Sequence, residues 1–294
     1  MKTFELKDGK NHYGMMNRIT GYDYHDKCYC PGTKSYIRTD NGKPIDGCIC
    51  KTMYDLEKIS WSMVKMEPQV ASPAEGFVRH TAHEEITYVI SGKGHLEFPD
   101  GKRYELDTDK TFYLEKGQPH RIVNDSDEVL VLYVVYSCSL SAIERDVYKD
   151  GDPFNTECHC KYMSINDALQ KIAPGFTGNA GDAGHYTAII FEGEDICFLH
   201  PVMCGGNSSP MEDFVSHPGV DELECLVSGK LSVIMPDRTY TLTPDIVRYN
   251  PPEQPSKSWN NYEEDARLLV FYSTGKLANV YRTHKHAVVF EIQN

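Results

Sequence analysis

Short apolar segments recur along the chain, and each is bounded by residues that favour turns. They are rich in Val, Ile, Tyr and Phe, and Gly, Pro, Asp and Asn separate them, as is typical of short β-strands. They fall at residues 86–91, 94–98, 111–114, 120–123 and 129–137, and again at 223–228, 231–235, 247–249 and 267–273. Residues 164–172 instead show a helical pattern, with Ser164 as the N-cap. The pattern predicts an all-β chain with a few short helices.

The two halves also repeat one another in sequence. The segment EITYVISGK at residues 85–93 matches ELECLVSGK at residues 222–230, a shift of 137 positions. One residue is then dropped in a turn and the shift becomes 136, so that Asn124 matches Asn260. Such self-similarity indicates two copies of one fold. We therefore expect two similar β-barrels or sandwiches, in residues 1–145 and 146–294.

Charge and hydropathy narrow the classes of partner. The chain has 294 residues and a net charge of −13. A field of this sign repels phosphate backbones and anionic lipid surfaces, so we expect no nucleic acid and no membrane as partner. The N-terminal sequence MKTFELKDGK lacks the apolar stretch of a secretory signal. These features together predict a cytoplasmic location.

The ten cysteines are expected to be reduced thiols in that compartment. Three pairs have the spacing C-x-C: Cys28 with Cys30, Cys48 with Cys50, and Cys158 with Cys160. Structural zinc sites usually have a spacing of C-x2-C or wider. We therefore favour thiols packed in strands or loops, with metal or redox chemistry as the alternative.

Two short motifs in the first half contain side chains that bind metals. The first runs from His80 to Glu85 and, after six intervening residues, to Gly92. The second is GQPHRIVN at residues 117–124. The segments that carry them are predicted to be strands or the turns between strands, so side chains from both motifs can point into one barrel.

These motifs resemble the two boxes that characterise the cupin family. The resemblance covers roughly residues 60–140 and 190–275. It implies two tandem cupin β-barrels of the jelly-roll type, and it also implies that the chain forms a homo-oligomer.

The resemblance further implies a metal held by His80, Glu85 and His120. Two imidazoles and one carboxylate suit one divalent transition metal, either Mn, Fe, Zn, Ni or Co. Three protein ligands leave positions open for water or substrate. The usual first histidine of the family's His-x-His pair falls on Val78, and His83 is a candidate for the lost ligand. The alternative is a metal-free barrel with hydrogen-bonded polar side chains.

The second half retains only part of this set. His217 and Glu222 preserve the first box, whereas Ser256 stands where the second histidine belongs and Glu253 replaces the glycine of the turn. A neutral hydroxyl is a poor ligand for these metals. We expect a degenerate second site, in which His217 and Glu222 hydrogen-bond each other.

The function that we expect is that of a metal-dependent enzyme acting on a small keto, enol or carboxylate compound. The reaction would be a non-redox hydrolysis, lyase cleavage or isomerisation, and the motifs leave the general base unassigned. An Fe(II)-dependent dioxygenase is the first alternative, because the same ligands suit oxygen activation. A non-catalytic protein that binds a sugar-like small molecule is the second. Motifs for nucleotide binding and for serine hydrolysis are missing from the sequence.

Overall fold

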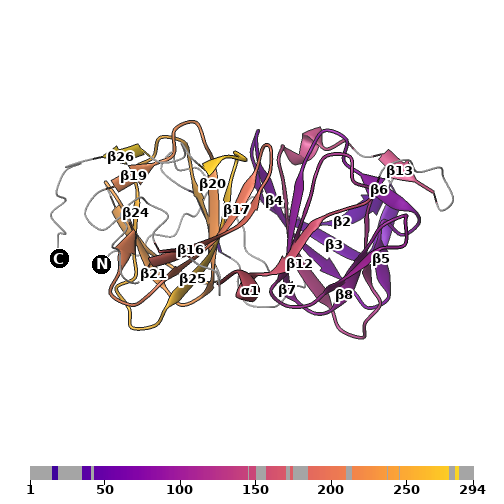
Figure 1. Ribbon diagram of the computed structural model, residues 1–294, viewed down its shortest axis with the longest axis horizontal. Coiled ribbons are helices and arrows are strands. Elements are labelled where there is room, and N and C mark those ends of the chain that lie inside the picture. Colours follow the sequence, from indigo (N-terminus) through magenta and orange to yellow (C-terminus); the bar gives the residue numbers. More distant parts are fainter. Residues whose placement is uncertain are drawn as a thin grey trace. The chain divides into compact units, whose positions relative to one another are not determined.

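The computed structural model describes residues 15–18, 35–40, 43–144, 146–149, 157–169, 173–174, 185–209, 214–236, 238–244, 246–277 and 282–284. Nearly all the elements in these ranges are strands, which confirms the all-β prediction (Figure 1). The helical exceptions in the described part are the 3-10 turn η1 (Leu140–Ala142) and the helix α1 (Ile165–Leu169). The helix begins one residue after the predicted cap, Ser164, and the predicted residues 170–172 lie outside the described ranges.

The first unit consists of one large sheet, one small sheet and a strand pair. The strands of the large sheet are β2 (Ser35–Asp40), β3 (Lys43–Asp55), β4 (Ser60–Met66), β7 (Glu85–Ser91), β10 (Lys110–Leu114), β12 (Leu130–Tyr136) and β14 (Lys161–Ser164). Their order is β14-β10-β7-β12-β4-β3-β2. The small sheet contains β5 (Val70–Ser72), β11 (Arg121–Asn124), β8 (Gly94–Glu97) and β9 (Arg103–Leu106), and the pair consists of β13 (Asp146–Tyr148) and β6 (Phe77–Arg79).

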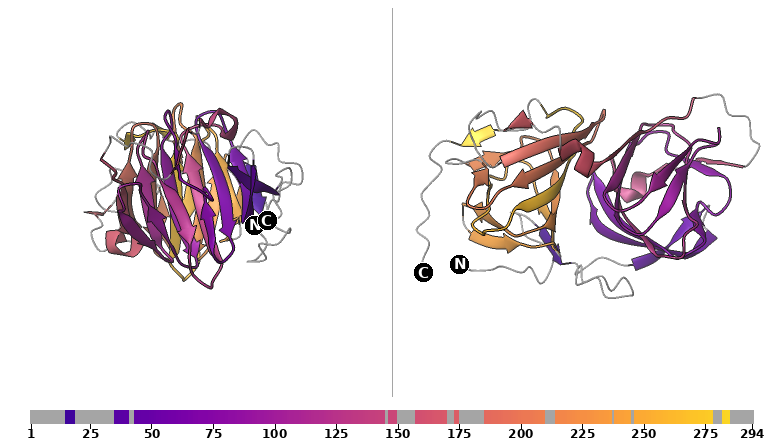
Figure 2. Two further views of the ribbon diagram at one scale, coloured as in Figure 1. Left: turned by 90° about the vertical axis from the view of Figure 1, so that its right-hand side faces the viewer. Right: turned by 60° about the horizontal axis from the view of Figure 1, so that its bottom comes forward.

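The second unit repeats this arrangement. The strands of its large sheet are β1 (Met15–Arg18), β15 (Ala173–Pro174), β16 (His185–Glu192), β17 (Cys197–Met203), β20 (Glu222–Ser228), β23 (Ile246–Asn250) and β25 (Ala266–Tyr272). Their order is β1-β23-β20-β25-β17-β16-β15. The small sheet contains β18 (Ser208–Ser209), β24 (Lys257–Trp259), β21 (Leu231–Met235) and β22 (Arg238–Leu242), and the pair consists of β19 (Phe214–Ser216) and β26 (Arg282–His284). The right-hand view of Figure 2 shows the strands of each unit curving around its own interior.

The compact units differ from the predicted division at residues 145 and 146. One unit comprises Thr33–Asp167, and the other joins the N-terminal strand β1 to the chain from Ala168 onward. The strand β14 pairs with β10 in the first unit, and β1 pairs with β23 in the second. Each large sheet thus takes one edge strand from a segment that sequence order alone assigns to the other half.

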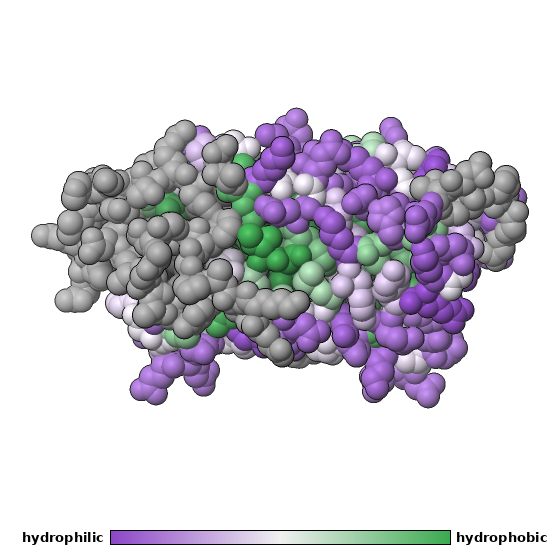
Figure 3. Space-filling model, viewed as in Figure 1, coloured by the Kyte–Doolittle hydropathy of each residue, from purple (hydrophilic) through white to green (hydrophobic). Residues whose placement is uncertain are grey.

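A cluster of buried apolar side chains fills much of the interior of each barrel, as the alternation of side chains along the strands requires. In the first unit, buried Val89, Leu96 and Phe112 belong to one core cluster. Tyr88, between the inward-facing Thr87 and Val89, lies outside this cluster and donates a hydrogen bond to Asp109. Thr87 and Val89 therefore lie on the inward face of β7. Hydrophilic side chains cover much of the outer surface of this unit in the view of Figure 3.

The cysteines of the C-x-C pairs pack mainly as small apolar side chains. Cys48, Cys50 and Cys158 are buried in the core cluster of the first unit, and Cys160 packs against it. Burial raises the pKa of the Cys158 thiol to about 11, which keeps it protonated near neutral pH. The eight cysteines in the described ranges form no disulfide with one another, whereas Cys28 and Cys30 lie outside those ranges. No described helix has the length and apolarity that crossing a membrane requires.

Candidate metal centre

The backbone of the first barrel brings the two sequence motifs together. His80 follows directly after β6, Glu85 opens β7, and His120 directly precedes β11. An isolated antiparallel bridge joins Val78 to His120, with backbone hydrogen bonds of 2.9 and 2.8 Å. The amide of Gly117, at a left-handed φ of 84°, donates to the His80 carbonyl at 2.7 Å. The residues of both motifs therefore meet at one end of one barrel.

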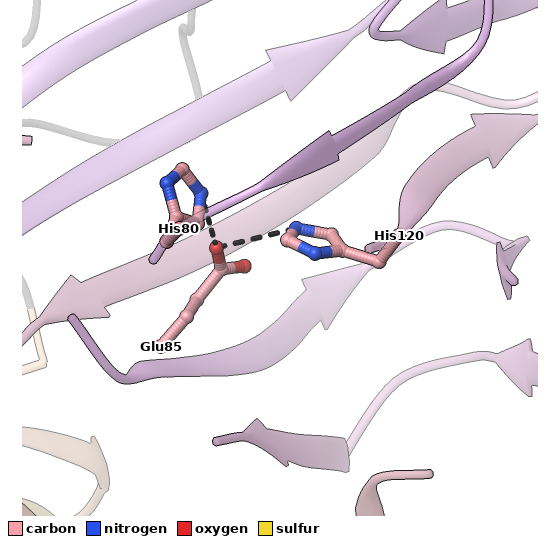
Figure 4. Close-up of side chains that lie close together, drawn as sticks. All are labelled: His80, Glu85 and His120. Carbon is pink, nitrogen blue, oxygen red and sulfur yellow. Dashed lines mark ion pairs between the residues drawn. The ribbon is translucent and has the colours of Figure 1, made fainter. Parts of the chain in front are cut away.

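The three predicted ligands form a compact buried cluster (Figure 4). His80, Glu85 and His120 are at most 3% exposed. The Nε2 atoms of both histidines lie 3.4 Å from the same carboxylate oxygen, Glu85 Oε2. The candidate ligand atoms all lie within 4.8 Å of one another, and the two rings are tilted by 52°. The cluster holds two imidazole nitrogens and one carboxylate, the set that the sequence predicts.

Hydrogen bonds fix the tautomer of both histidines. Nδ1 of His80 lies 3.3 Å from the carbonyl oxygen of Glu144, and Nδ1 of His120 lies 3.0 Å from that of Gln118. A carbonyl oxygen only accepts, so each Nδ1 carries the proton and, in the neutral ring, Nε2 keeps its lone pair. Metal-binding histidines commonly use their other ring nitrogen in this way. Both Nε2 atoms thus have the electronic form that a ligand needs.

The Glu85 carboxylate has one satisfied oxygen and one unsatisfied oxygen. Its Oε1 accepts a hydrogen bond of 2.9 Å from the Thr87 hydroxyl, while Oε2 is buried and accepts none within the described part of the chain. Burial raises the pKa of this carboxyl, but His120 and His80, when they carry a proton on Nε2, outweigh burial and bring the pKa well below 4.5. A buried carboxylate oxygen without a donor is costly. A cation between Oε2 and the two Nε2 atoms would give the Glu85 oxygen a partner, so these residues fit a divalent metal.

The fourth family position and its candidate replacement lie outside the cluster. Val78 is a buried apolar residue whose backbone, not its side chain, pairs with His120. His83 stands in the turn between β6 and β7, and its Nε2 lies 2.8 Å from the carbonyl oxygen of Ala142. The structure therefore does not bring His83 into the site, because the turn directs it toward η1. The hydrogen bonds from the two histidines to the Gln118 and Glu144 carbonyls could not be predicted from the sequence, because every residue type has the same backbone carbonyl.

In the second barrel the equivalent residues take the same places. The isolated bridge here joins Val215 to Ser256, and His217 and Tyr272 have ring centroids 5.0 Å apart. The corresponding separation of His80 and Tyr136 is 5.2 Å. Nε2 of His217 lies 3.2 Å from Glu222 Oε2, so these two side chains are in contact. The second barrel retains two of the three candidate ligands.

Two buried charges beside Glu222 are missing from the sequence analysis. Arg248, on β23, donates from Nη1 to Glu224 Oε1 at 2.5 Å and lies 3.9 Å from Glu222 Oε2. Burial raises the pKa of the Glu222 carboxyl, yet His217 and Arg248 bring it down to about 2. Aligning the two repeats would have revealed these residues, because Arg248 corresponds to the apolar Phe112 and Glu224 corresponds to Thr87.

Comparison with known proteins agrees with this geometry. The family model described as "Cupin domain" matches residues 62–136, which include all three candidate ligands of the first barrel. No curated protein sequence matches the chain at a significant level.

Several solved structures share the fold across most of the chain. A glyoxylate-induced protein from Pseudomonas aeruginosa has a TM-score of 0.61 at 10% identity, covering 94% of this chain and 97% of that one. Oxalate decarboxylase from Bacillus subtilis has a TM-score of 0.57 at 14% identity, with coverage of 94% and 81%. Salicylate 1,2-dioxygenase from Pseudoaminobacter salicylatoxidans has a TM-score of 0.61 at 10% identity, with coverage of 77% and 74%.

The fold, the two motifs and these matches define the class of the protein. Residues 62–136 match the cupin domain, and the described residues form two tandem barrels with the jelly-roll fold of cupins. At these identities the structural neighbours share the fold with this chain, and the site itself has to carry the functional argument.

Proposed function

We propose that the protein is a metal-dependent enzyme whose single metal centre consists of His80, Glu85 and His120. The observation that carries the proposal is the environment of Glu85 Oε2. This buried oxygen accepts no hydrogen bond among the described residues, and it faces two imidazole Nε2 atoms at 3.4 Å. Three electron-pair donors that converge in a buried place favour a cation between them.

The chain's own residues would hold and orient this centre. Thr87 Oγ1 fixes one carboxylate oxygen of Glu85, so that the other is directed toward the histidines. Tyr136 packs edge-on against the His80 ring, and the carbonyls of Glu144 and Gln118 fix the two ring orientations. A divalent metal bound in this site would supply Lewis-acid stabilisation of a substrate oxygen. With three protein ligands, positions remain for a small substrate.

The substrate class that we propose is a small keto, enol or carboxylate compound. Two structural neighbours are named for reactions of small carboxylic acids, oxalate and salicylate, and a third is named as induced by glyoxylate. These names support the class and no individual compound. The reaction that we propose is non-redox, either hydrolysis, lyase cleavage or isomerisation.

A second candidate is an Fe(II)-dependent dioxygenase. Two histidines and one carboxylate with open positions are the ligand set of many non-haem iron oxygenases. One structural neighbour is itself a dioxygenase. The two functions differ in their requirement for molecular oxygen, and this difference decides the experiment.

The test uses the full chain loaded separately with Mn, Fe, Zn, Ni or Co, and assayed against small 2-oxo, enol and dicarboxylic acids. We expect substrate turnover under strict exclusion of oxygen, lost in His120→Ala and retained in His83→Ala. Turnover only with iron, accompanied by oxygen consumption, would favour the dioxygenase. If His120→Ala leaves the activity intact, the proposed centre is not the active site.

A further inference from the structure

The second barrel differs from the first at two inward-facing pairs on neighbouring strands. In the first barrel the register pairs Glu85 with Leu114 and Thr87 with Phe112. In the second barrel the equivalent pairs are Glu222 with Asn250 and Glu224 with Arg248. Two apolar side chains are thus replaced by an amide and a guanidinium, and a threonine is replaced by a carboxylate.

The guanidinium of Arg248 lies in the interior of the barrel. Its side chain is 1% exposed, and Nη1 donates to Glu224 Oε1 at 2.5 Å. Nε donates to the hydroxyl of Tyr240 at 2.9 Å, and Nη1 also lies 3.9 Å from Glu222 Oε2. A buried carboxylate pair needs a cation near it. In this barrel an arginine of the chain itself provides the positive charge.

Both carboxylate oxygens of Glu222 accept a hydrogen bond, whereas only one oxygen of its counterpart Glu85 does so among the described residues. The Tyr272 hydroxyl donates to Oε1 at 2.9 Å, and the Asn250 amide donates to Oε2 at 3.0 Å. The same Asn250 nitrogen lies 3.4 Å from the Ser256 hydroxyl oxygen, beside the position that corresponds to His120 in the first barrel. The Asn250 amide therefore lies between the Glu222 carboxylate and the Ser256 hydroxyl. In the first barrel no donor takes this place, and Glu85 Oε2 accepts no hydrogen bond among the described residues.

We propose that the second barrel is built as a metal-free site, in which the Arg248 guanidinium and the Asn250 amide take the place of a metal. The loss of a histidine at Ser256 is then one of several changes that exclude a metal. A divalent ion would be repelled by the fixed guanidinium, and it would have to displace the Asn250 donor from Glu222. Restoring the histidine alone should consequently fail to restore a metal site.

The experiment compares two variants in the His120→Ala background, in which the first site is disabled. One carries Ser256→His alone. The other adds Glu224→Thr, Arg248→Phe and Asn250→Leu, so that all four positions copy the first barrel. Co(II) titration followed by absorbance and calorimetry measures the affinity, with the unsubstituted protein as reference. Circular dichroism and thermal unfolding establish that each variant is folded.

We expect Ser256→His to bind Co(II) at least about 100-fold more weakly than the reference, and the fourfold variant to approach the reference within about 10-fold. Reference-like affinity in Ser256→His alone overturns the proposal, as does failure of a folded fourfold variant to bind. Should the fourfold variant unfold, Ser256→His with Arg248→Met and Glu224→Gln removes both charges at nearly constant volume. This variant must then bind more tightly than Ser256→His, and equal affinity of the two overturns the proposal.

Discussion

At the scale of single residues, the two barrels differ in what surrounds one glutamate oxygen. Glu85 Oε2 faces two histidines and has no donor within the described part of the chain. Glu222 Oε2 receives the Asn250 amide and lies near Arg248 and His217. The same carboxylate position thus suits a metal in one barrel and an internal ion pair in the other.

The Thr87 hydroxyl should tune the affinity of the first site. Thr87→Val removes the hydrogen bond to Glu85 Oε1 and leaves the carboxylate free to rotate away from the histidines. We expect a loss of about 10–100-fold in metal affinity, typical of residues that orient ligands. Calorimetric titration measures the change. Thr111→Val is the matched control, since that hydroxyl donates to the Thr87 carbonyl and not to the carboxylate; equal losses in both variants would contradict the assigned role.

Arg248 should be a large contributor to the stability of the second barrel. Arg248→Met leaves Glu224 buried without its cation, and breaking such a pair typically costs about 3–5 kcal/mol. Urea unfolding gives the value, provided that the transition of the second unit is resolved. Adding Glu224→Gln to Arg248→Met removes the orphaned charge, and should recover most of the loss. A loss below about 1 kcal/mol in the single variant would show that the pair is solvated.

The candidate ligands could be predicted from sequence, whereas their surroundings could not. His80, Glu85 and His120 follow fixed spacings, and Ser256 is recognisable as a break in the same pattern. The burial of Arg248 is not predicted from its residue type, because a charged residue within a strand usually faces the solvent. Its register opposite Glu224, and its match to the buried Phe112 of the first repeat, place it inside the barrel.

At the scale of elements, one turn in each barrel holds the backbone of the first histidine. Gly117 donates from its amide to the His80 carbonyl, and Glu253 donates in the same way to the His217 carbonyl. Both residues have a left-handed backbone, with φ of 84° and 65°. A side chain makes that conformation costly. The second barrel therefore retains the left-handed backbone of the turn, but it has Glu253 at the position where glycine would be unstrained.

Glu253→Gly should stabilise the second barrel. Glycine adopts the left-handed region without strain, and its extra freedom in the unfolded chain offsets part of the benefit, so we expect a gain of about 0.5–1 kcal/mol. Gly117→Ala is the converse and should cost a similar amount. A Cβ at Gly117 would meet nothing within 4 Å, so the cost there comes from the backbone alone. Thermal unfolding measures both, and a loss of stability in Glu253→Gly would refute the account of this turn.

Glu97 links three strands of the small sheet of the first barrel, and the link should depend on pH. It pairs with Arg121 on β11, Arg103 on β9 and His95 on β8. Burial raises the pKa of Glu97, but Arg121 and His95 bring it below its ordinary value of 4.5. Because the folded pKa is depressed, the stabilisation is fully present above pH 4.5 and is lost as the pH falls through the folded value.

Glu97→Gln should therefore cost about 1.5–3 kcal/mol at pH 7, as expected for hydrogen bonds between charged groups. The difference from the unsubstituted protein should shrink as the pH falls below 4.5. Unfolding curves of both proteins between pH 7 and pH 3 measure it. A difference that stays constant over this range would mean that the charge of Glu97 does not contribute.

Elements with strong local patterns could be predicted, and those that depend on distant partners could not. The strands β8 and β21 are predicted to within one residue from their own composition. The edge strands β1 and β14 each pair with a sheet assembled mainly from other parts of the chain. Their partners are set by tertiary pairing, which a local pattern does not encode.

At the scale of the whole molecule, the chain is a duplication whose copies have diverged in their centres. The strand orders of the two units correspond throughout the described residues, and both retain the bridge between the two boxes. The second copy has a guanidinium, a carboxylate and an amide in its interior at the three positions where the first copy has Phe112, Thr87 and Leu114. From this difference we infer a single metal centre per chain, in the first barrel.

The number of metal centres per chain can be measured by elemental analysis after loading and removal of excess metal. We expect about one divalent ion per chain in the unsubstituted protein, the same in Ser256→Ala, and none in His120→Ala. Absence of metal in the unsubstituted protein would rule out a metal centre in the first barrel. Two ions per chain, or full retention of metal in His120→Ala, would rule out a single centre on these ligands.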